Sequence, residues 1–293
     1  MKPAPFKYIE VADEEALTAA LADHGDDARL LAGGQSLVPM MNFRVVSPKV
    51  VIDLNRVAAL SYIDCRDDVC RIGALTRHAM IENSDPLCRR CELLGQAARN
   101  VAHRAVRNRG TMGGTLALAY PGAEIPLALM TLDADVILRS KRGERRLGMK
   151  DFILGALDTS LSEDEYVRHV EISMPPPGSA ASFVETSRRH GDFAIAAAAV
   201  VAARDDHGRV SYLRAGIAGG TGAPIRLTAL EEALSGDDPD DRRIANNVHE
   251  AIAAIEVFGD YHYPEDFRRH VLKGVLQRAL KDAIARSDRR YVQ

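Results

Sequence analysis

Two short glycine-rich segments carry the residues that are best suited to binding a phosphate group. The first, residues 30–37, reads Leu-Leu-Ala-Gly-Gly-Gln-Ser-Leu and begins as a buried strand. Two adjacent glycines let the backbone approach a ligand closely, and successive amide N–H groups can form a concave anion site. Gln35 and Ser36 add side-chain donors. The spacing is not G-x-G-x-x-G and no P-loop lysine follows, so the common dinucleotide and Walker motifs are excluded.

The second segment, residues 103–115, reads His-Arg-Ala-Val-Arg-Asn-Arg-Gly-Thr-Met-Gly-Gly-Thr. Thr111 and Thr115 flank a second glycine pair, and each hydroxyl can bind a phosphate oxygen. We expect at least one of the preceding arginines to lie on a solvated surface. Either segment alone is more often a tight turn. Together, on two adjacent units, they predict a diphosphate gripped from both sides, as in a dinucleotide that lies in a cleft between domains.

The four cysteines, Cys65, Cys70, Cys88 and Cys91, lie close together in the sequence and could suggest a metal site. The first two flank a predicted turn at Asp67-Asp68, so they should face each other across a hairpin. The second two lie one helical turn apart. No histidine lies among these four, so we predict no metal site. We also expect no disulfide, because such bonds are rare in a reducing compartment.

Composition limits the class of protein further. The 293 residues carry a formal net charge of −3, which gives no general attraction to nucleic acid or anionic membrane. The N-terminus has no apolar stretch of the signal-peptide kind, and the longest apolar run, 194–203, is far shorter than the ~20 residues of a membrane span. We expect a soluble, cytoplasmic chain. No Ser/His/Asp grouping or paired acidic motif predicts a catalytic residue.

The pattern of elements predicts an α+β fold in three units. A triple proline at 175–177 cannot continue a helix or a central strand, and it marks the last boundary. The units are an N-terminal β/α unit (1–56), a second mixed unit (57–176) and a C-terminal unit (177–293). The predicted strands are near 6–8, 29–31, 50–52, 60–64, 69–73, 135–139, 144–148, 166–172, 193–203 and 210–217; the helices are near 14–24, 77–82, 92–102, 241–255 and 265–286; turns or loops are expected at Pro39-Met40-Met41 and around both glycine pairs.

Five stretches, in order, carry a resemblance to a known family. They are LLAGGQSLVPMMNFRVVSPKVVIDLN, RIGALTRHAMIE, VRNRGTMGGTLALAYPGAEIPLALMTLDADV, RRHGDFAIAAAAV and GIAGGTGAPIR. The chain resembles the FAD-binding (medium) subunit of the xanthine dehydrogenase and carbon monoxide dehydrogenase family of molybdenum hydroxylases, from about residue 5 to 285. The resemblance implies a two-part FAD-binding domain of the PCMH type, followed by an α+β C-terminal domain with a small antiparallel sheet and helices.

The resemblance also implies a set of cofactor-binding residues and no catalytic residue or metal ligand. Both glycine segments would hold the FAD pyrophosphate. An acidic residue, Glu124 here and usually aspartate in the family, would contact the sugar-alcohol chain, and Phe193, preceded by Asp192, would lie against the isoalloxazine ring. Two positions depart from the family: Tyr120 replaces a small or acidic residue, and Glu185 lies near a frequent lysine. The implied FAD-binding residues are Ala32, Gly33, Gly34, Gln35, Ser36, Leu37, Thr111, Gly113, Gly114, Thr115, Glu124, Asp192 and Phe193.

The implied function is an electron relay. A large molybdopterin-binding subunit would oxidise the substrate, a small subunit with 2Fe-2S clusters would carry the electrons, and the FAD of this chain would pass them to a soluble acceptor. The resemblance also implies a dimer of heterotrimers. Two alternatives stay open at this point. They are a free-standing FAD-dependent oxidoreductase of related fold, and a redox-inactive nucleotide-binding assembly module.

Overall fold

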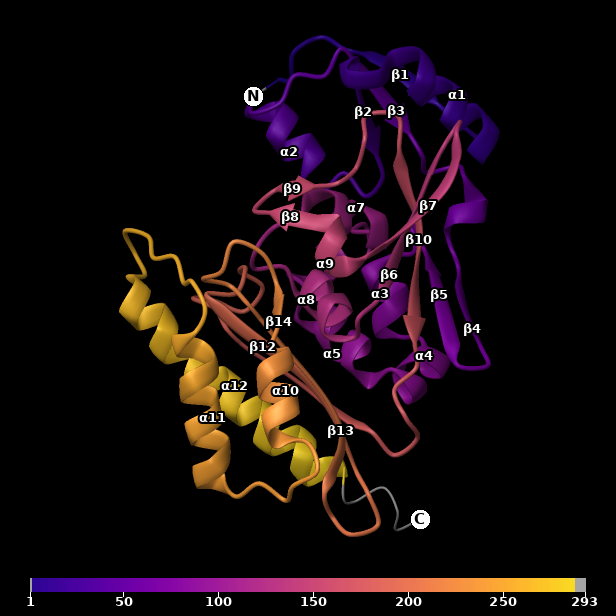
Figure 1. Ribbon diagram of the computed structural model, residues 1–293. Helices are drawn as coiled ribbons and strands as arrows, with labels where there is room; N and C mark the ends of the chain where they lie inside the picture. Colours follow the sequence, from indigo (N-terminus) through magenta and orange to yellow (C-terminus); the bar gives the residue numbers. More distant parts are fainter. Residues whose placement is uncertain (1, 288–293) are drawn as a thin grey trace.

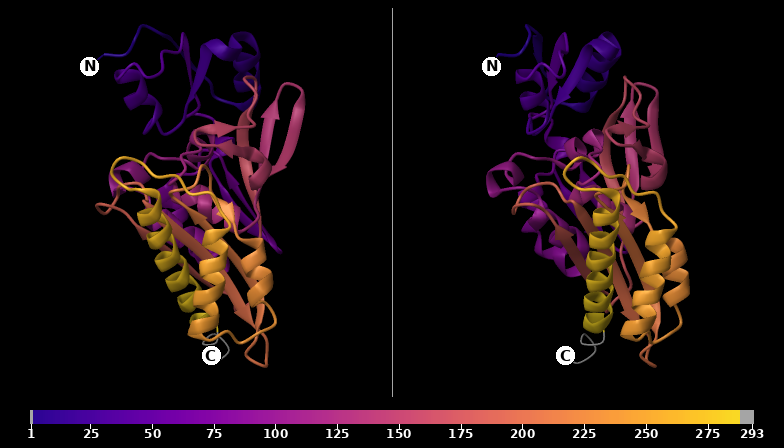
Figure 2. Two further views of the ribbon diagram at one scale, coloured as in Figure 1. Left: turned by 60° about the vertical axis from the view of Figure 1, so that its left-hand side comes forward. Right: turned by 90° about the vertical axis from the view of Figure 1, so that its left-hand side faces the viewer.

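The described chain builds three main β-sheets one after another, each with its own helices, and a small two-stranded sheet, β8 (Ile153–Gly155) paired with β9 (Asp158–Thr159), within the middle part (Figure 1). The computed structural model describes residues 2–287; Met1 and residues 288–293, which end the predicted C-terminal unit, lie outside the described residues. In both views of Figure 2 the indigo N-terminal part lies at one end and the yellow and orange C-terminal helices lie toward the opposite end. No helix within residues 2–287 has the length and apolar character that a membrane span requires.

The N-terminal sheet is parallel, in the order β1-β3-β2. Because the strands are parallel, β2 and β3 end at the same edge, and ligands of open α/β sheets bind outside such carboxyl ends. Residues 37–42 form a short helix where we expected a turn. Pro39 lies in its first turn, where a proline breaks no intrahelical hydrogen bond. The elements are β1 (Lys7–Glu10), α1 (Glu14–His24), β2 (Ala28–Leu31), α2 (Leu37–Asn42) and β3 (Val50–Asp53).

The middle sheet is antiparallel, in the order β4-β5-β10-β6-β7, and its helices pack on one face. Every residue of α8 is buried, which explains why its sequence shows a continuous apolar run rather than an amphipathic pattern. The elements are β4 (Ile63–Arg66), β5 (Val69–Gly73), α3 (His78–Glu82), α4 (Asp85–Arg90), α5 (Glu92–Asn100), α6 (Arg104–Arg107), α7 (Met112–Leu118), α8 (Glu124–Thr131), β6 (Asp135–Ser140), β7 (Gly143–Gly148), α9 (Met149–Phe152), β8 (Ile153–Gly155), β9 (Asp158–Thr159) and β10 (Tyr166–Ser173).

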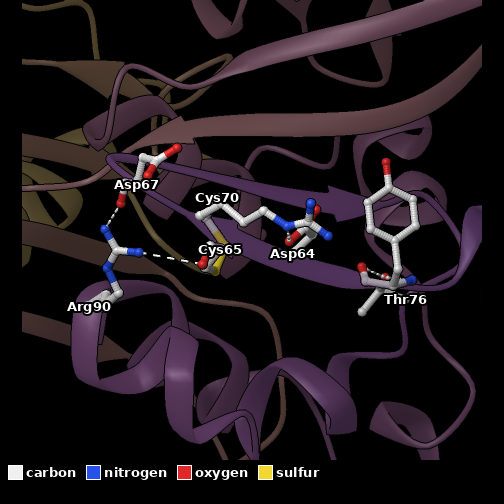
Figure 3. The surroundings of a disulfide bond; sticks show 8 residues. Asp64, Cys65, Asp67, Cys70, Thr76 and Arg90 are labelled. Carbon is white, nitrogen blue, oxygen red and sulfur yellow. Dashed lines mark hydrogen bonds and ion pairs between the residues drawn. A yellow bond between two sulfur atoms is a disulfide. The ribbon is translucent and has the colours of Figure 1, made fainter.

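The β4–β5 hairpin contains a disulfide between Cys65 and Cys70, so the prediction that no disulfide forms was wrong (Figure 3). The two cysteines are direct register partners across the hairpin, as predicted, and their Cα atoms are 3.9 Å apart. This pairing brings the two side chains together on one face of the hairpin. Arg90 of α4 donates hydrogen bonds to the carbonyl oxygens of Cys65 and Asp67, which fixes the hairpin against the helix. Cys88 and Cys91 are free thiols.

One acidic side chain joins the N-terminal part to the middle sheet. Glu14, at the start of α1, accepts hydrogen bonds from Tyr166 (2.7 Å) and Arg168 (2.9 Å) and pairs with Arg139 (3.3 Å). These partners lie on β6 and β10. The arginines lower the pKa of the Glu14 carboxyl despite its partial burial. The N-terminal sheet is therefore held to the middle sheet by a charged network as well as by an apolar core that includes Leu75 and Tyr166 of the middle part.

The C-terminal sheet is antiparallel and lies between two layers of helices. Alternate residues of β12 face α10–α12 on one side and the core of the middle part on the other, so the strand is buried on both faces. This explains its unbroken apolar sequence. Strand β11 and helix α10 were not predicted. The elements are β11 (Ala180–Thr186), β12 (Ala196–Arg204), β13 (Val210–Ala218), β14 (Ile225–Arg226), α10 (Thr228–Leu234), α11 (Asp241–Ala253) and α12 (Glu265–Ser287).

The contact between β13 and α8 leaves no room for a side chain at Gly216, which gives a test of this packing. An added Cβ would lie 2.3 Å from Thr131 Oγ1, so we expect Gly216→Ala to lower the free energy of unfolding by about 1–3 kcal/mol. Gly274 is an exposed residue of α12 with nothing within 4 Å of an added Cβ. Gly274→Ala should raise the free energy of unfolding by roughly 0.5–1 kcal/mol, because alanine favours the helical conformation more than glycine does. Urea unfolding of both variants measures the two opposite effects, and equal effects would contradict this account.

Candidate cofactor-binding site

Most of the predicted binding residues line one cavity of about 360 Å³ between the N-terminal and middle parts. Both glycine segments, the start of α8 and the loop before β12 contribute to its wall. Predicted residues that line it are Ala32, Gly33, Gly34, Gln35, Ser36, Leu37, Thr111, Gly114, Thr115, Glu124 and Phe193, whereas Gly113 and Asp192 are not among its lining residues.

The first glycine segment offers a row of free backbone donors. It leaves the carboxyl end of β2 and enters α2, and Gly34 has a φ of +73°, which favours glycine. Within residues 2–287, the amide N–H groups of residues 33–37 donate to no protein acceptor. Buried or half-buried amides of this kind need a partner, and consecutive ones form an anion-binding concavity. This segment therefore fits a pyrophosphate.

The second glycine segment is the first turn of α7 rather than the loop that we predicted. Thr111 is the N-cap, and its Oγ1 accepts a hydrogen bond from the Gly114 amide at 3.2 Å, so the local sequence begins a helix here. Gly113 faces the middle sheet: its amide donates to the Ala74 carbonyl at 2.8 Å, and an added Cβ would lie 2.7 Å from Ala74 Cβ. The two glycines thus differ, because Gly113 allows close packing and Gly114 faces the cavity.

The two segments touch through their backbones. A Cβ at Gly33 would lie 2.3 Å from the carbonyl oxygen of Arg109, so only glycine permits this approach. Arg77 donates to the same carbonyl and to Asn55 Oδ1 (2.6 Å), and Asn55 donates to the carbonyl of Ala32 (3.0 Å). Sequence reasoning missed Arg77 and Asn55. Arg77 begins a predicted helix and Asn55 lies shortly after a predicted strand, but nothing in the sequence shows that they meet.

The arginines of the second segment do not all face the cavity. Arg107 binds Glu82 at 2.8 Å and donates to the carbonyls of Val101 and Ala102, so it holds α6 against α3. Arg104 and Arg109 are exposed. This agrees with the expectation that at least one arginine lies on a solvated surface.

His78 is a buried residue of the site that sequence reasoning did not assign. It lines the cavity, it is 5% exposed, and its Nε2 lies 3.1 Å from the carbonyl oxygen of Thr111. Because a carbonyl oxygen can only accept a hydrogen bond, Nε2 carries the proton and Nδ1 is unprotonated, with a free lone pair. Its backbone N–H donates to the Gly110 carbonyl at 3.0 Å. Burial, together with the charges of Arg107 and Arg77, lowers the pKa of His78 to about 4, so it fixes the start of α7 as a neutral ring.

Glu124 is the most deeply buried acid of the cavity wall. It begins α8 and is 4% exposed, and burial raises the pKa of its carboxyl to about 7. A carboxyl in this state can either accept or donate a hydrogen bond near neutral pH, which suits contact with a hydroxyl-bearing chain.

An aromatic ring, Phe193, lines another part of the cavity and packs on a second ring behind it. Phe193 is 51% exposed and stacks on Tyr120, with ring centroids 3.9 Å apart. Gly191, with a φ of +87°, brings the preceding loop against His103. Asp192 pairs with Arg188 at 3.6 Å at the surface. An exposed ring beside a buried acid is a suitable surface for a planar heterocycle.

Comparison with known proteins agrees with this geometry. The sequence pattern of the FAD binding domain in molybdopterin dehydrogenase matches residues 4–175. The chain belongs to this family of FAD-binding subunits. The pattern of the CO dehydrogenase flavoprotein C-terminal domain matches residues 181–283. The resemblance, the α+β fold class and the FAD cofactor are thereby confirmed, and the chain is an FAD-dependent oxidoreductase subunit of the molybdenum hydroxylase family.

Similar proteins extend over nearly the whole chain. The 6-hydroxypseudooxynicotine dehydrogenase complex subunit alpha of Paenarthrobacter nicotinovorans is 38% identical and covers 98% of this chain and 97% of its own length. The carbon monoxide dehydrogenase medium chain of Hydrogenophaga pseudoflava is 31% identical, with 98% and 99% covered. A solved structure of carbon monoxide dehydrogenase from that organism, which lacks the Mo-pyranopterin moiety of the molybdenum cofactor, superimposes with a TM-score of 0.93 at 32% identity, covering 98% of this chain and 99% of that chain.

The buried neutral state of His78 predicts a pH dependence of stability. In the unfolded chain His78 binds a proton below its ordinary pKa of 6.5, but in the folded chain only below about 4. Between pH 6.5 and 4 the unfolded state therefore binds more protons than the folded state. As pH falls from 7.5 to 4, this lowers the free energy of unfolding by roughly 3 kcal/mol. We expect the stability difference between wild type and His78→Gln to shrink by that order over this range. Urea unfolding at several pH values measures it.

The matched control is His207→Gln, at an exposed histidine in the β12–β13 turn. If His78→Gln and His207→Gln change the pH profile equally, then His78 is not held neutral in the fold.

Proposed function

We propose that this chain carries electrons between partner subunits and a soluble acceptor. In this proposal, 2Fe-2S clusters of a small subunit reduce the FAD, and a large molybdopterin-binding subunit oxidises the substrate. The family membership supports the cofactor and the class of enzyme. The observation that carries the proposal is the meeting of two glycine segments at one cavity, with five free amides on the first of them.

The predicted residues have separate roles in this proposal. The amides of residues 33–37 and the Gly114–Thr115 edge of α7 would hold the pyrophosphate. Glu124 would bind a hydroxyl of the sugar-alcohol chain, and Phe193 would lie against the isoalloxazine ring. Gly113 and Asp192 would contribute without touching the cofactor. Gly113 lets α7 pack on the middle sheet, and Asp192 pairs with Arg188.

FAD supplies one- and two-electron redox chemistry when it is bound, and the protein supplies position and electrostatics. The Gly33–Arg109 contact and the Arg77–Asn55 bridge set the separation of the two segments. Neutral His78 sets the start of α7 without adding charge. Phe193 and Tyr120 provide an apolar face that excludes water from one side of a bound ring. No residue of this chain is proposed as a catalytic acid or base toward the substrate, and none as a metal ligand.

The organisation of the chain and its assembly complete the proposal. We assign residues 1–56 and 57–176 to the two FAD-binding subdomains and 177–293 to the C-terminal domain. Each contains one of the main sheets, which supports the division. The proposed assembly is a dimer of heterotrimers in the cytoplasm, without contact to nucleic acid.

A glycine substitution tests the cavity as the FAD site. Gly34→Ala forces a Cβ into a positive-φ position and within 3.3 Å of Leu31 and Val38, so we expect FAD to bind about tenfold or more weakly. Gly236→Ala carries the same backbone penalty at a φ of +78°, with nothing within 4 Å of the new Cβ, and should bind FAD normally. Flavin absorbance and fluorescence titration of the apo chain measure both. Equal affinities would place FAD elsewhere.

The relay requires partners. Co-expressed large and small subunits should copurify with this chain, and substrate should then bleach the flavin bands, whereas the FAD-loaded chain alone should be reduced by dithionite but not by substrate. Substrate turnover by the isolated chain would support a free-standing oxidoreductase instead. A chain that takes up no FAD on reconstitution, even in the presence of its partners, would support the assembly module.

A further inference from the structure

A third glycine-rich segment, residues 216–222, does not line the cavity, yet it packs against the loop that carries Phe193. Gly219 has a φ of +75°, which favours glycine. A Cβ on it would lie 2.8 Å from the carbonyl oxygen of Ala194 and 2.9 Å from that of Ile195. The segment is therefore in close contact with the backbone one and two residues beyond Phe193.

Arg268 reaches the same backbone from the first turn of α12. Its Nη1 donates to the Ile195 carbonyl at 3.2 Å, and its Nη2 pairs with Asp260 of the loop before α12. Its Nε donates to the Tyr263 carbonyl at 3.4 Å. The side chain is only 14% exposed, so these three partners satisfy a guanidinium that is largely out of contact with water.

Gly220 provides the space for this arginine. It has a φ of +94°, and an added Cβ would lie 3.1 Å from Arg268 Cδ and 3.4 Å from Arg268 Cβ. The carbonyl of Gly220 accepts a hydrogen bond from the Phe258 amide at 2.7 Å, which joins the glycine segment to the loop between α11 and α12. The glycine segment, this loop and the start of α12 therefore pack together around the Ile195 carbonyl.

The Ile195 carbonyl lies where the Phe193 loop enters the C-terminal sheet. The Ile195 amide donates to the Thr186 carbonyl at 2.8 Å, and β12 begins one residue later. Within residues 2–287 the Ile195 carbonyl accepts no hydrogen bond other than the one from Arg268. Because Phe193 is only two residues away, the orientation of this carbonyl affects the path of the backbone that carries the ring.

We propose that Arg268 is a positioning residue of the FAD site, which holds Phe193 at the cavity by binding the Ile195 carbonyl. This role rests on the proposed function, since it takes the flavin ring as the group against which Phe193 lies. Arginine suits it, because its fork of N–H donors binds a carboxylate and a carbonyl at once. The C-terminal part thus contributes to cofactor binding through a side chain that does not line the cavity.

The effect on the loop is tested first without FAD, on the whole chain. Arg268→Gln removes the donor to Ile195, so amide hydrogen exchange in residues 187–195 should become about tenfold or more faster. The matched control is Arg269→Gln, because Arg269 pairs with Glu265 and donates to the Ile252 carbonyl, away from this loop. It should leave exchange in residues 187–195 unchanged. Wild-type exchange in Arg268→Gln, or equal acceleration in both variants, would overturn the proposal.

A more conservative variant covers the case in which Arg268→Gln fails to fold. Arg268→Lys keeps the positive charge and the aliphatic stem beside Gly220, but a single ammonium cannot reproduce the two-pronged contact with Asp260 and Ile195. Its loop should exchange about threefold or more faster than that of wild type. Exchange at the wild-type rate would contradict the proposed role of the fork.

The effect on the cofactor is tested by a double-mutant cycle. Arg268→Gln and Phe193→Ala should each raise the Kd for FAD by about fivefold or more, whereas Arg268→Gln should add less than about twofold in a chain that already carries Phe193→Ala, because it acts through that ring. Visible circular dichroism of the bound flavin should change in Arg268→Gln but not in Arg269→Gln.

Two outcomes of the cycle have different meanings. Fully additive effects on the Kd would show that Arg268 acts independently of Phe193, and would overturn the positioning role. If no protein, including the wild type, binds FAD, the proposed function fails instead. The exchange measurement then still decides whether Arg268 holds the loop.

Discussion

The cofactor site depends on one close approach between two stretches of backbone. Gly33 and the carbonyl of Arg109 come from parts of the chain with separate sheets, and no side chain fits between them. Arg77, Asn55 and His78 hold the flanking carbonyls in place. The remaining features of the cavity follow from this contact. It directs the free amides of the first segment and the cavity-facing edge of α7 toward the same volume.

A similar constraint of size governs the C-terminal part. Its sheet packs on helices of the middle part through alanines of β12 and through Gly216, so the two layers approach closely. The loop between β11 and β12 then extends to the cavity and contributes Phe193. The C-terminal part thus supplies a wall of the site in addition to its own core.

Sequence reasoning predicted most elements because their signals are local. Apolar periodicity and turn residues located the β4–β5 hairpin, the strands of the middle sheet and the long C-terminal helices. It failed where the deciding contact is distant. Strand β11 has a mixed sequence, and its partner β12 and the Gln96 side chain determine its conformation. The glycine pairs were recognised from the sequence, but the different orientations of Gly113 and Gly114, and the roles of Arg77 and His78, depend on packing between units.

Because the site is divided between two sheets, ligand binding also affects the stability of the junction between the N-terminal and middle parts. The N-terminal part shares its apolar core with Leu75 and Tyr166 of the middle part, and the Glu14 network adds polar contacts at the same junction. A ligand that bridges both glycine segments adds its binding free energy to that junction, because it binds only the closed arrangement. A bound cofactor therefore also stabilises the junction between the two parts, which is less stable in the unloaded chain than in the loaded one.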